Sequence, residues 1–284
     1  MTCVQPSTLP RPPLRQLGTY AMLAGVGTLI LMPVVWLVIT SFKRDVEYLT
    51  YPITWVPAVP QWGNYVAALT IIPFFTYVGN SLVLGLTYTV LCVFTSAMAG
   101  YAFARFALPA RNVLFTVVVA LLMIPQIVTV LPQFILFSRL QLTNSYWPWV
   151  LWGLSASPFH IFLFRQFFAA FPKELEEAAE IDGCGPTRIF WQMFLPNAQA
   201  VLATSAIFNF TWVWGDWFTP LLFLGDANTT LAVKLATAYV NPQGQPLIPI
   251  TLAACVLYAM PPIVLFFLAQ RYILQGVVTS GLKG

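Results

Sequence analysis

The sequence predicts an all-α, polytopic membrane protein with six transmembrane helices, and three observations lead to this fold class. Of the 284 residues, 59% are hydrophobic and only 8% are charged, whereas soluble domains are roughly 45–50% apolar and about 25% charged. The charged residues leave six charge-free intervals of at least 25 residues. A transmembrane helix needs about 20 mostly apolar residues, so each interval accommodates one. This composition excludes a soluble globular enzyme, a disordered chain and a disulfide-stapled secreted domain.

The expected spans follow these intervals in order along the chain. The interval 48–104 is long enough for two spans, but its first part is rich in proline and polar residues, which do not suit a helix exposed to lipid. We therefore expect one span there, preceded by an extramembrane outer loop over residues 43–75. A second outer loop is expected over residues 225–246. The six expected spans are 17–42, 76–103, 112–138, 147–168, 197–223 and 247–270.

The basic residues are distributed unevenly between the loops. If the N-terminus lies inside, nine of the 13 Lys and Arg residues fall on the cytoplasmic side and four on the outer side. Because cytoplasmic loops carry an excess of Lys and Arg, this distribution predicts an N-in, C-in orientation. Cytoplasmic tails over residues 1–16 and 271–284 then flank a single transmembrane domain over 17–270. The first span is too long for the core of a signal peptide and lacks a clear small-residue cleavage site, so we expect it to remain as a span.

The sequence offers no constellation for catalysis or metal binding. The four cysteines show no CxxC spacing, and the single histidine, His160, cannot by itself build a multi-histidine metal site. No GxxxxGK[ST] sequence is present, so the chain has no P-loop with which to bind ATP. We expect no metal site, no cofactor bound by this chain and no enzymatic activity of its own.

The cytoplasmic segment 169–196 is the most informative loop, and we call it the coupling loop. Ala178 and Ala179 lie on one face of its first short helix, which Gly183 is suited to end. Pro186 opens a second short helix with an apolar face. The acidic excess of the loop disfavours a helix lying on the negatively charged cytoplasmic leaflet and favours a projection that docks on another protein. Five of the nine acidic residues of the chain occur here, namely Glu174, Glu176, Glu177, Glu180 and Asp182.

The coupling loop also carries a family resemblance. Glu177-Ala178-Ala179, then Gly183, then Leu195-Pro196 reproduce the EAA loop, E-A-A-x-x-x-G-x9-I-x-L-P, of bacterial binding-protein-dependent ABC importer permeases, with Met193 in place of the usual Ile. From about residue 15 to its end, the chain resembles the carbohydrate-uptake, maltose-transporter type of this family. The other matching motifs, in order, are Asn64-Tyr65, Asn80-Ser81, GYAFAR at 100–105, WGDWFTPL at 214–221, and the segment 270–284.

The resemblance implies an ABC importer type I permease fold in the cytoplasmic (inner) membrane. It implies a second permease subunit, an ATPase dimer that binds ATP and Mg, and an extracytoplasmic solute-binding protein that delivers a sugar, with no nucleic acid involved. Closure of the ATPases would then drag the coupling loop and drive alternating access. The residues implied to dock on an ATPase are Glu177, Ala178, Ala179, Asp182, Gly183, Leu195 and Pro196.

A polar stripe in the expected fifth span is a candidate for the substrate pathway. Ser205, Asn209, Trp212 and Asp216 recur at i, i+4, i+7 and i+11 on one side of a helix. Hydroxyl and amide groups hydrogen-bond sugar hydroxyls, and an aromatic face covers the apolar face of a pyranose. The alternative is interhelical hydrogen bonding with an interfacial tryptophan belt. Both interpretations stay open at this point.

The charge of the cargo is also constrained by the sequence. The expected membrane cores contain no Lys or Arg, apart from Arg165 near a helix end, and an anionic solute would normally find a cation in its path. This favours a neutral mono- or oligosaccharide over a related solute such as glycerol 3-phosphate. A secondary carrier working without ATP is the alternative from another functional class.

The outer loop 225–246 is long for a simple connection. It mixes a polar stretch over 241–245 with apolar residues, among them Leu231, Val233 and Tyr239. A purely solvated loop would not need these apolar side chains, so we expect the loop to pack against something outside the bilayer. The resemblance implies that it reaches into the solute-binding protein, and the alternative is a loop folded on its own subunit.

Overall fold

The computed structural model describes residues 13–107 and 109–281. Within these residues the chain forms helices joined by loops, with an isolated bridge between Val240 and Pro246 and no strand. The helices are α1 (Pro13–Ser41), α2 (Asp45–Leu49), α3 (Gly63–Thr70), α4 (Phe74–Arg105), α5 (Arg111–Ala120), the 3₁₀ helix η1 (Leu121–Met123), α6 (Gln126–Arg139), α7 (Trp147–Leu154), α8 (Pro158–Ala169), α9 (Lys173–Ile181), α10 (Pro186–Ile189), the π-helix η2 (Phe190–Phe194), α11 (Leu195–Asn197), α12 (Gln199–Gly215), α13 (Phe218–Phe223), α14 (Leu231–Thr237) and α15 (Ile248–Gly281).

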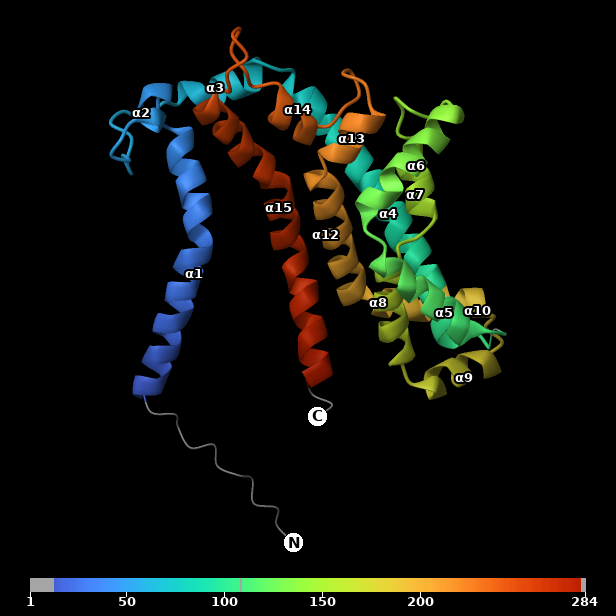
Figure 1. Ribbon diagram of the computed structural model, residues 1–284. Coiled ribbons are helices and arrows are strands. Elements are labelled where there is room, and N and C mark those ends of the chain that lie inside the picture. The colour runs from blue at the N-terminus through green and yellow to red at the C-terminus, as the bar shows by residue number, and fades with distance from the viewer. Residues whose placement is uncertain (1–12, 108, 282–284) are drawn as a thin grey trace.

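The molecule has two opposite ends that carry different loops. Figure 1 shows α2, α3, α13 and α14 gathered at one end, which we call the α14 end, and α9 and α10 at the other, which we call the α9 end. The long helices α1, α4 and α15 run between the two ends (Figure 1). The start of α1 and the end of α15 both lie at the α9 end, so the two ends of the described chain are on the same side.

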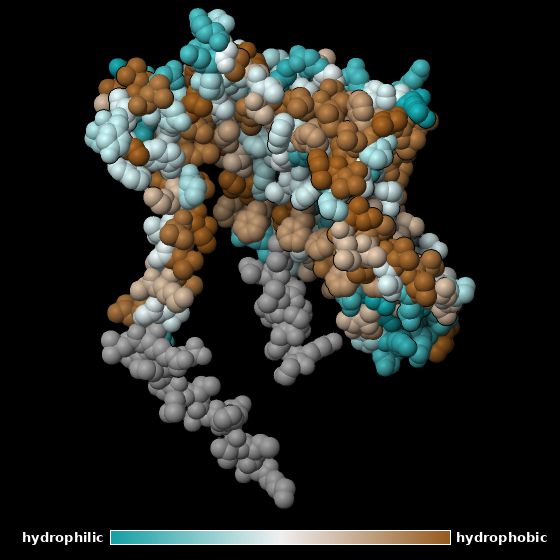
Figure 2. All heavy atoms as spheres, viewed as in Figure 1, coloured by the Kyte–Doolittle hydropathy of each residue, from teal (hydrophilic) through white to brown (hydrophobic). Residues whose placement is uncertain are grey.

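Hydrophobic residues separate the middle of the molecule from its ends. On the face shown in Figure 2 they cover much of the middle, whereas hydrophilic residues gather over the loops at the α14 end and over α9. Among the described residues, three helical stretches are long and apolar enough to cross a membrane: Gln16–Ser41, Phe74–Arg105 and Ile248–Tyr272. The predicted all-α membrane architecture is confirmed. The count of six spans and the N-in, C-in orientation stay predictions.

The predicted span 112–138 is broken into two helical parts. The helical stretch Arg111–Met123 and α6 meet at 98°. Ile124 between them is extended, with φ −83° and ψ 117°, because the residue before a proline avoids the helical region. Pro125 also has no N–H to continue the helical hydrogen bonds. Prolines are tolerated in transmembrane helices, so the sequence alone does not identify this one as a break.

Two further predicted spans each consist of two helices. In 147–168, α7 ends at Leu154 and α8 starts at Pro158, and Ala156 between them adopts a positive φ of 60°. In 197–223, α12 ends at Gly215 and Asp216 is extended before α13 begins. The predicted loop 43–75, by contrast, contains the short helices α2 and α3.

Helix α4 is the central element, because it packs against α7, α8 and α12. The Thr95 hydroxyl donates a hydrogen bond of 2.8 Å to the carbonyl of Gly153 at the end of α7. The Ser157 N–H donates one of 3.0 Å to the Ser96 hydroxyl, just before α8 begins. Gly100 allows α8 to approach closely, since a Cβ atom there would lie 2.5 Å from the Cβ of Phe164.

We predict that Gly100→Ala destabilises the protein by about 1–3 kcal/mol, because the added methyl group overlaps the backbone-proximal atoms of α8, which cannot move aside cheaply. Gly79→Ala is the matched control in the same helix, since nothing lies within 4 Å of its added Cβ. Alanine favours a helix over glycine by up to about 1 kcal/mol, so the control should be neutral or stabilising. The midpoint of thermal unfolding in detergent measures both. Equal midpoints for the two variants would contradict the close α4–α8 contact.

Candidate functional site

The first helix of the coupling loop ends in a glycine turn, as the sequence predicts. Gly183 has a φ of +80°, a conformation that glycine adopts without strain. Its N–H donates to the carbonyl of Glu180 at 3.0 Å, and the Cys184 N–H donates to the carbonyl of Ala179 at 2.9 Å. These two bonds form a Schellman motif, which satisfies the last carbonyls of α9 and turns the chain sharply toward α10.

Arg105, the last residue of α4, fastens the coupling loop to the transmembrane helices. Its Nη2 donates to the carbonyls of Phe168 and Phe171, both at 2.7 Å, and so caps the end of α8. Its Nη1 lies 3.2 Å from Oε2 of Glu176 in α9. The two side chains are only 5% and 17% exposed, so this ion pair is shielded from solvent. The guanidinium of Arg105 thus links α4 to the end of α8, to the connection that follows it, and to α9.

An aromatic cluster fills the space beneath the second half of the coupling loop. Tyr101 of α4 lies at its centre, with ring centroids 5.2 Å from Phe190 and 4.9 Å from Phe194. Phe164 and Phe168 of α8 complete the cluster, and both are fully buried. The predicted apolar face of the second short helix therefore packs inward. The cluster gives the projecting loop a rigid base.

Some of the predicted docking residues pack against the protein interior, and the others are exposed. Ala179 packs against the aromatic cluster, whereas Ala178, which the helical pattern places on the same face, is exposed. Leu195 also packs inward. Ile181, whose side chain is 86% exposed, is an apolar surface residue that the sequence analysis did not single out. The exposed members of the predicted set are Glu177, Ala178, Asp182, Gly183 and Pro196.

The four residues of the predicted polar stripe do not lie together. Ser205 and Asn209 are buried at 0% and 4% exposure, in a helix that packs against both α4 and α15, and the Asn209 side chain lies beside Cys92 of α4. Trp212 is 65% exposed. The Ser205 hydroxyl and the Asn209 amide nitrogen are buried without a hydrogen-bond partner among the described residues, so the pathway and the interhelical interpretations both stay predictions for these two residues, whereas the side of α12 that carries Trp212 is exposed.

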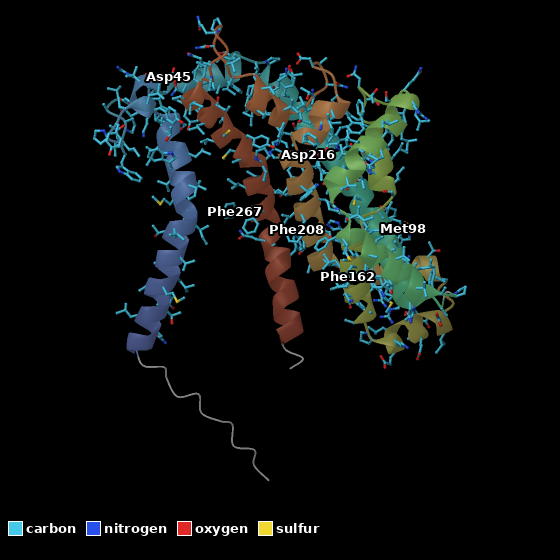
Figure 3. All side chains as sticks on the ribbon, viewed as in Figure 1. Asp45, Met98, Phe162, Phe208, Asp216 and Phe267 are labelled. Atoms are coloured by element: carbon cyan, nitrogen blue, oxygen red, sulfur yellow. The ribbon has the colours of Figure 1, made fainter. Side chains whose placement is uncertain are left out.

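Asp216 has a local structural contact at the end of α12. Its Oδ1 accepts hydrogen bonds of 3.0 Å from the N–H groups of Phe218 and Thr219, the first residues of α13. A carboxylate at a helix N-terminus satisfies free N–H groups and complements the helix dipole. Figure 3 shows Asp216 at the α14 end of α12 and Phe208 farther along the same helix. These hydrogen bonds give Asp216 a structural role at the start of α13, which does not require a bound ligand.

The outer loop 225–246 folds on its own subunit and leaves a projecting tip. Leu231, Val233 and Tyr239 are buried, and the Tyr239 hydroxyl donates 2.6 Å to the carbonyl of Ala68 in α3. The stretch 241–245 is a tight polar turn in which Asn241 and Gln245 bond to each other. It stands out from the α14 end (Figure 1). The base of the loop thus packs as the own-subunit alternative requires, while its tip is exposed.

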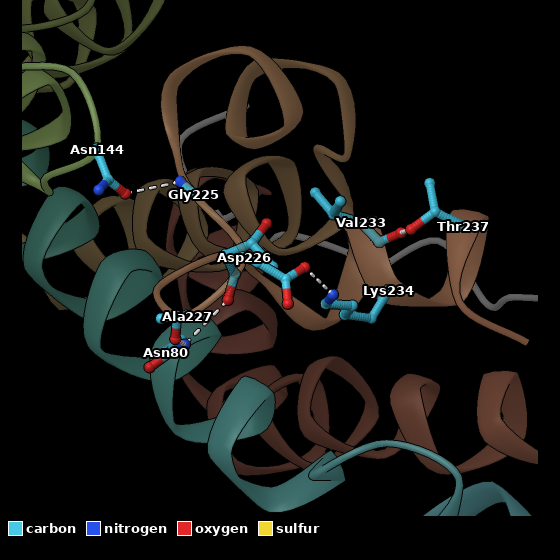
Figure 4. A network of polar contacts seen from close by, with 9 residues as sticks. Asn80, Asn144, Gly225, Asp226, Ala227, Val233, Lys234 and Thr237 are labelled. Carbon is cyan, nitrogen blue, oxygen red and sulfur yellow. Dashed lines mark hydrogen bonds and ion pairs between the residues drawn. The ribbon is translucent and has the colours of Figure 1, made fainter.

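Polar side chains hold the first half of the outer loop in place (Figure 4). The Asn80 amide donates to the carbonyls of Ala227 at 3.2 Å and Thr229 at 3.0 Å. The Ser81 hydroxyl accepts 2.9 Å from the N–H of Leu231, the first residue of α14. Both side chains come from the α14 end of α4, so this helix positions the start of α14.

Two further contacts complete the network of Figure 4. The Asn144 Oδ1 accepts 2.8 Å from the Gly225 N–H, which joins the loop to the α6–α7 connection. Lys234 forms an ion pair with Asp226. Burial would lower the pKa of the Lys234 ammonium, but hydrogen bonds with Asp226 and Tyr77 outweigh it and raise the pKa. The ammonium therefore stays charged at neutral pH.

Three such positioning residues, Asn64, Asn80 and Arg105, belong to the family motifs of the sequence, but the motifs do not indicate their roles. Asn64 donates to the carbonyls of Ser41 and Lys43 at 2.8 and 2.9 Å, which ends α1. Asn80 holds the outer loop, and Arg105 holds the coupling loop. The family motifs that contain these residues were the only signal, and a motif does not reveal partners that lie far away in the sequence.

Comparisons with known proteins agree with this architecture. The family described as "Binding-protein-dependent transport system inner membrane component" matches residues 93–279. The chain is 34% identical over 265 residues to the "Arabinooligosaccharides transport system permease protein AraQ" of Halalkalibacterium halodurans, covering 92% of this chain and 94% of that protein. It is also 34% identical over 263 residues to the "sn-glycerol-3-phosphate transport system permease protein UgpE" of Pectobacterium atrosepticum, covering 90% and 93%.

A solved structure shows the same fold. A chain in the crystal structure of a bacterial ABC transporter involved in the import of the acidic polysaccharide alginate superposes with a TM-score of 0.78 at 19% identity, covering 94% of this chain and 99% of that one. The family match spans more than half of the sequence, and the two named relatives are similar over nearly their full lengths. The chain therefore belongs to the family of binding-protein-dependent ABC importer permeases, which are multi-pass components of the inner membrane.

Proposed function

We propose that this chain is the permease subunit of an ATP-driven importer that moves a neutral mono- or oligosaccharide by alternating access. The observation that carries the proposal is the coupling loop. It presents exposed small and apolar residues, Ala178 and Ile181, beside exposed acidic ones at the α9 end. Its buried base is fastened to α4 by Arg105. The exposed surface suits the docking of another protein. Because the base of the loop is buried and bonded to α4, a movement of the docked protein would shift the loop as a unit and would not unfold it.

The coupling loop requires partners on the cytoplasmic side. We place the α9 end in the cytoplasm, in line with the distribution of Lys and Arg, and the α14 end outside. An ATPase dimer then binds ATP and Mg and docks Glu177, Ala178, Asp182 and Gly183, while this chain hydrolyses nothing. A second permease subunit covers the exposed membrane faces, and a solute-binding protein meets the outer loops.

The exposed face of α12 is the pathway candidate within this subunit. Phe208 and Trp212 are 52% and 65% exposed, and aromatic faces of this kind cover the apolar face of a sugar ring. No Lys or Arg occurs in α12, which supports an uncharged cargo. The glycerol 3-phosphate relative supports an anionic cargo as the second candidate. Uptake of a neutral oligosaccharide in competition with glycerol 3-phosphate separates the two.

The test of the proposal is purification of the tagged chain from its own membranes. We expect an ATPase and a second permease to copurify in stoichiometric amounts, and the complex to hydrolyse ATP faster when the sugar-loaded solute-binding protein is added. Isolation of the chain alone, with no ATPase activity in any fraction that contains it, would contradict the proposal. Trp212→Ala should weaken uptake of sugar without changing the subunit composition.

We predict that deletion of residues 242–245 lowers the stimulation of ATP hydrolysis by the sugar-loaded solute-binding protein. The deleted residues form the exposed tip, whereas the buried base of the outer loop stays in place through Tyr239 and Leu231. Assembly with the ATPase should persist, because the coupling loop lies at the opposite end. Asp226→Asn is the control, since it alters the same loop away from the tip. If the deletion variant shows the same stimulation as the wild type, the tip plays no part in the response to the solute-binding protein.

A further inference from the structure

Both functional loops are fastened to the same helix, α4. At its α9 end, Arg105 bonds to Glu176 and to the carbonyls that begin the coupling loop. At its α14 end, Asn80 and Ser81 bond to the outer loop at Ala227, Thr229 and Leu231. The two attachment points are side chains of one continuous element. A movement of either loop therefore acts directly on α4.

Helix α4 has the properties of a rigid connector. It is an unbroken helix of 32 residues with no internal proline, and the 25 residue steps from Asn80 to Arg105 span about 38 Å at 1.5 Å per residue. Buried side chains occur along its whole length, from Phe74 to Tyr101. Its middle is held to the α7–α8 break by the bonds of Thr95 and Ser96. The helix thus moves as one body together with what packs against it.

The other described segments between the two ends are interrupted or lie apart. The route through α5 and α6 bends by 98°, and α7 and α8 are separated by a break. Figure 1 places α1 and the α9 end of α15 away from α9. Helix α12 follows the coupling loop and precedes the outer loop in the chain, but its backbone leaves helical geometry at Ala198 and again at Asp216. Helix α4 is the uninterrupted route.

We propose that α4 is the mechanical link between the two sides of the transporter, with Asn80 and Arg105 as the positioning residues at its ends. When the solute-binding protein displaces the outer loop, α4 carries that displacement to the coupling loop, and closure of the ATPases acts in reverse. The movement is a rigid-body shift of a packed helix. This inference rests on the proposed function, since it requires a binding protein at one end and an ATPase at the other.

A double-mutant cycle across the two ends tests the link. Asn80→Leu removes the amide that holds the outer loop, and Arg105→Lys keeps a positive charge near Glu176 but loses the forked contact to two carbonyls. The readout is the stimulation of ATP hydrolysis by the sugar-loaded solute-binding protein, divided by the basal rate of the same complex. Each single variant should lower the stimulation at least about threefold. The stimulation measured for the double variant should be no lower than that of the more severe single variant. Once α4 is detached from one loop, detaching it from the other loop has no further effect on the coupling.

Asn144→Gly is the matched control for the outer end. It removes the side-chain bond between Asn144 and the Gly225 N–H, one of the loop's contacts with the α6–α7 connection, and leaves the bonds to α4 in place. Glycine accepts the positive φ of 59° at this position. Its effect should multiply with that of Arg105→Lys, as is usual for independent distant sites. If Asn80→Leu does not assemble, Asn80→Ser removes the same amide without added bulk and replaces it in the cycle.

The outcomes separate the inference from the proposed function. The role of α4 would be overturned if the Asn80 and Arg105 variants reduced the stimulation by independent factors that multiply in the double variant. Wild-type stimulation in the Asn80 variant would overturn it as well. The proposed importer function would stand in both cases. A wild-type complex whose ATP hydrolysis does not respond to any sugar-loaded solute-binding protein would overturn both. Non-additive loss confined to the Asn80–Arg105 pair is the expected result.

Discussion

Replacement of Gly183 by proline is expected to abolish ATP-driven uptake. The Gly183 N–H donates to the carbonyl of Glu180, and its φ of +80° turns the chain between α9 and α10. Proline has no N–H and fixes φ near −65°, so it removes the bond and excludes the turn at a cost of about 3 kcal/mol or more. That cost lowers the population of the intact corner about 100-fold. Uptake into proteoliposomes that hold the reconstituted complex measures the loss.

Gly183→Asn is the control for this experiment. Asparagine enters the left-handed region more readily than other side chains, and it keeps the N–H, so most of the uptake should remain. Binding of the sugar to its isolated binding protein is independent of this chain and serves to standardise the assay. Wild-type uptake in the Gly183→Pro variant would show that the glycine corner plays no part in coupling.

Loss of the Arg105 guanidinium is expected to cause the largest loss of stability. Arg105→Met leaves the carboxylate of Glu176, 17% exposed, without its partner and removes the cap of α8. Removal of one partner from a buried ion pair costs about 3–5 kcal/mol, so the coupling loop should open more than about 100-fold more often. Trypsin cleavage after Arg188, which lies in α10, reports this opening, because cleavage follows the population of the open form.

Two companion variants sharpen the interpretation. Glu176→Gln added to Arg105→Met removes the unpaired charge and should recover part of the protection. Lys234→Met breaks the ion pair with Asp226, in which the lysine side chain is 13% exposed and the aspartate side chain 86%. Because the carboxylate lies in solvent, the pair contributes less than about 1 kcal/mol. Cleavage after Arg188 should therefore not change in Lys234→Met. Equal protection of the Arg105→Met variant and the wild type would contradict the anchoring role of Arg105.

The sequence predicts the helical membrane class and the coupling loop well, because both depend on local patterns. Runs of apolar residues identify long helices such as α1 and α15, and Gly183 ends α9 as its residue type suggests. The break at Pro125 is different. A proline in a membrane helix gives a kink or a full break depending on the neighbouring helices, and that information is not local.

The same limit applies to the candidate site. Helical periodicity places Ser205, Asn209 and Trp212 on one side of α12, but it does not reveal that neighbouring helices bury the first two and leave the third exposed. Ala178 and Ala179 point apart because the aromatic cluster beneath the loop takes up only one of them. The tertiary partners of Asn80 and Arg105 lie more than 60 residues away in the sequence, so no spacing rule finds them.

ATP-dependent uptake by the purified complex in proteoliposomes tests the central claim most directly. The complex is reconstituted with its second permease and ATPases, the sugar-loaded solute-binding protein is added on the side of the outer loops, and ATP is supplied on the side of the coupling loop. We predict accumulation of the sugar that requires both ATP hydrolysis and the binding protein, and that persists when ionophores collapse all ion gradients. Uptake that proceeds without ATP and follows an imposed ion gradient would contradict the account.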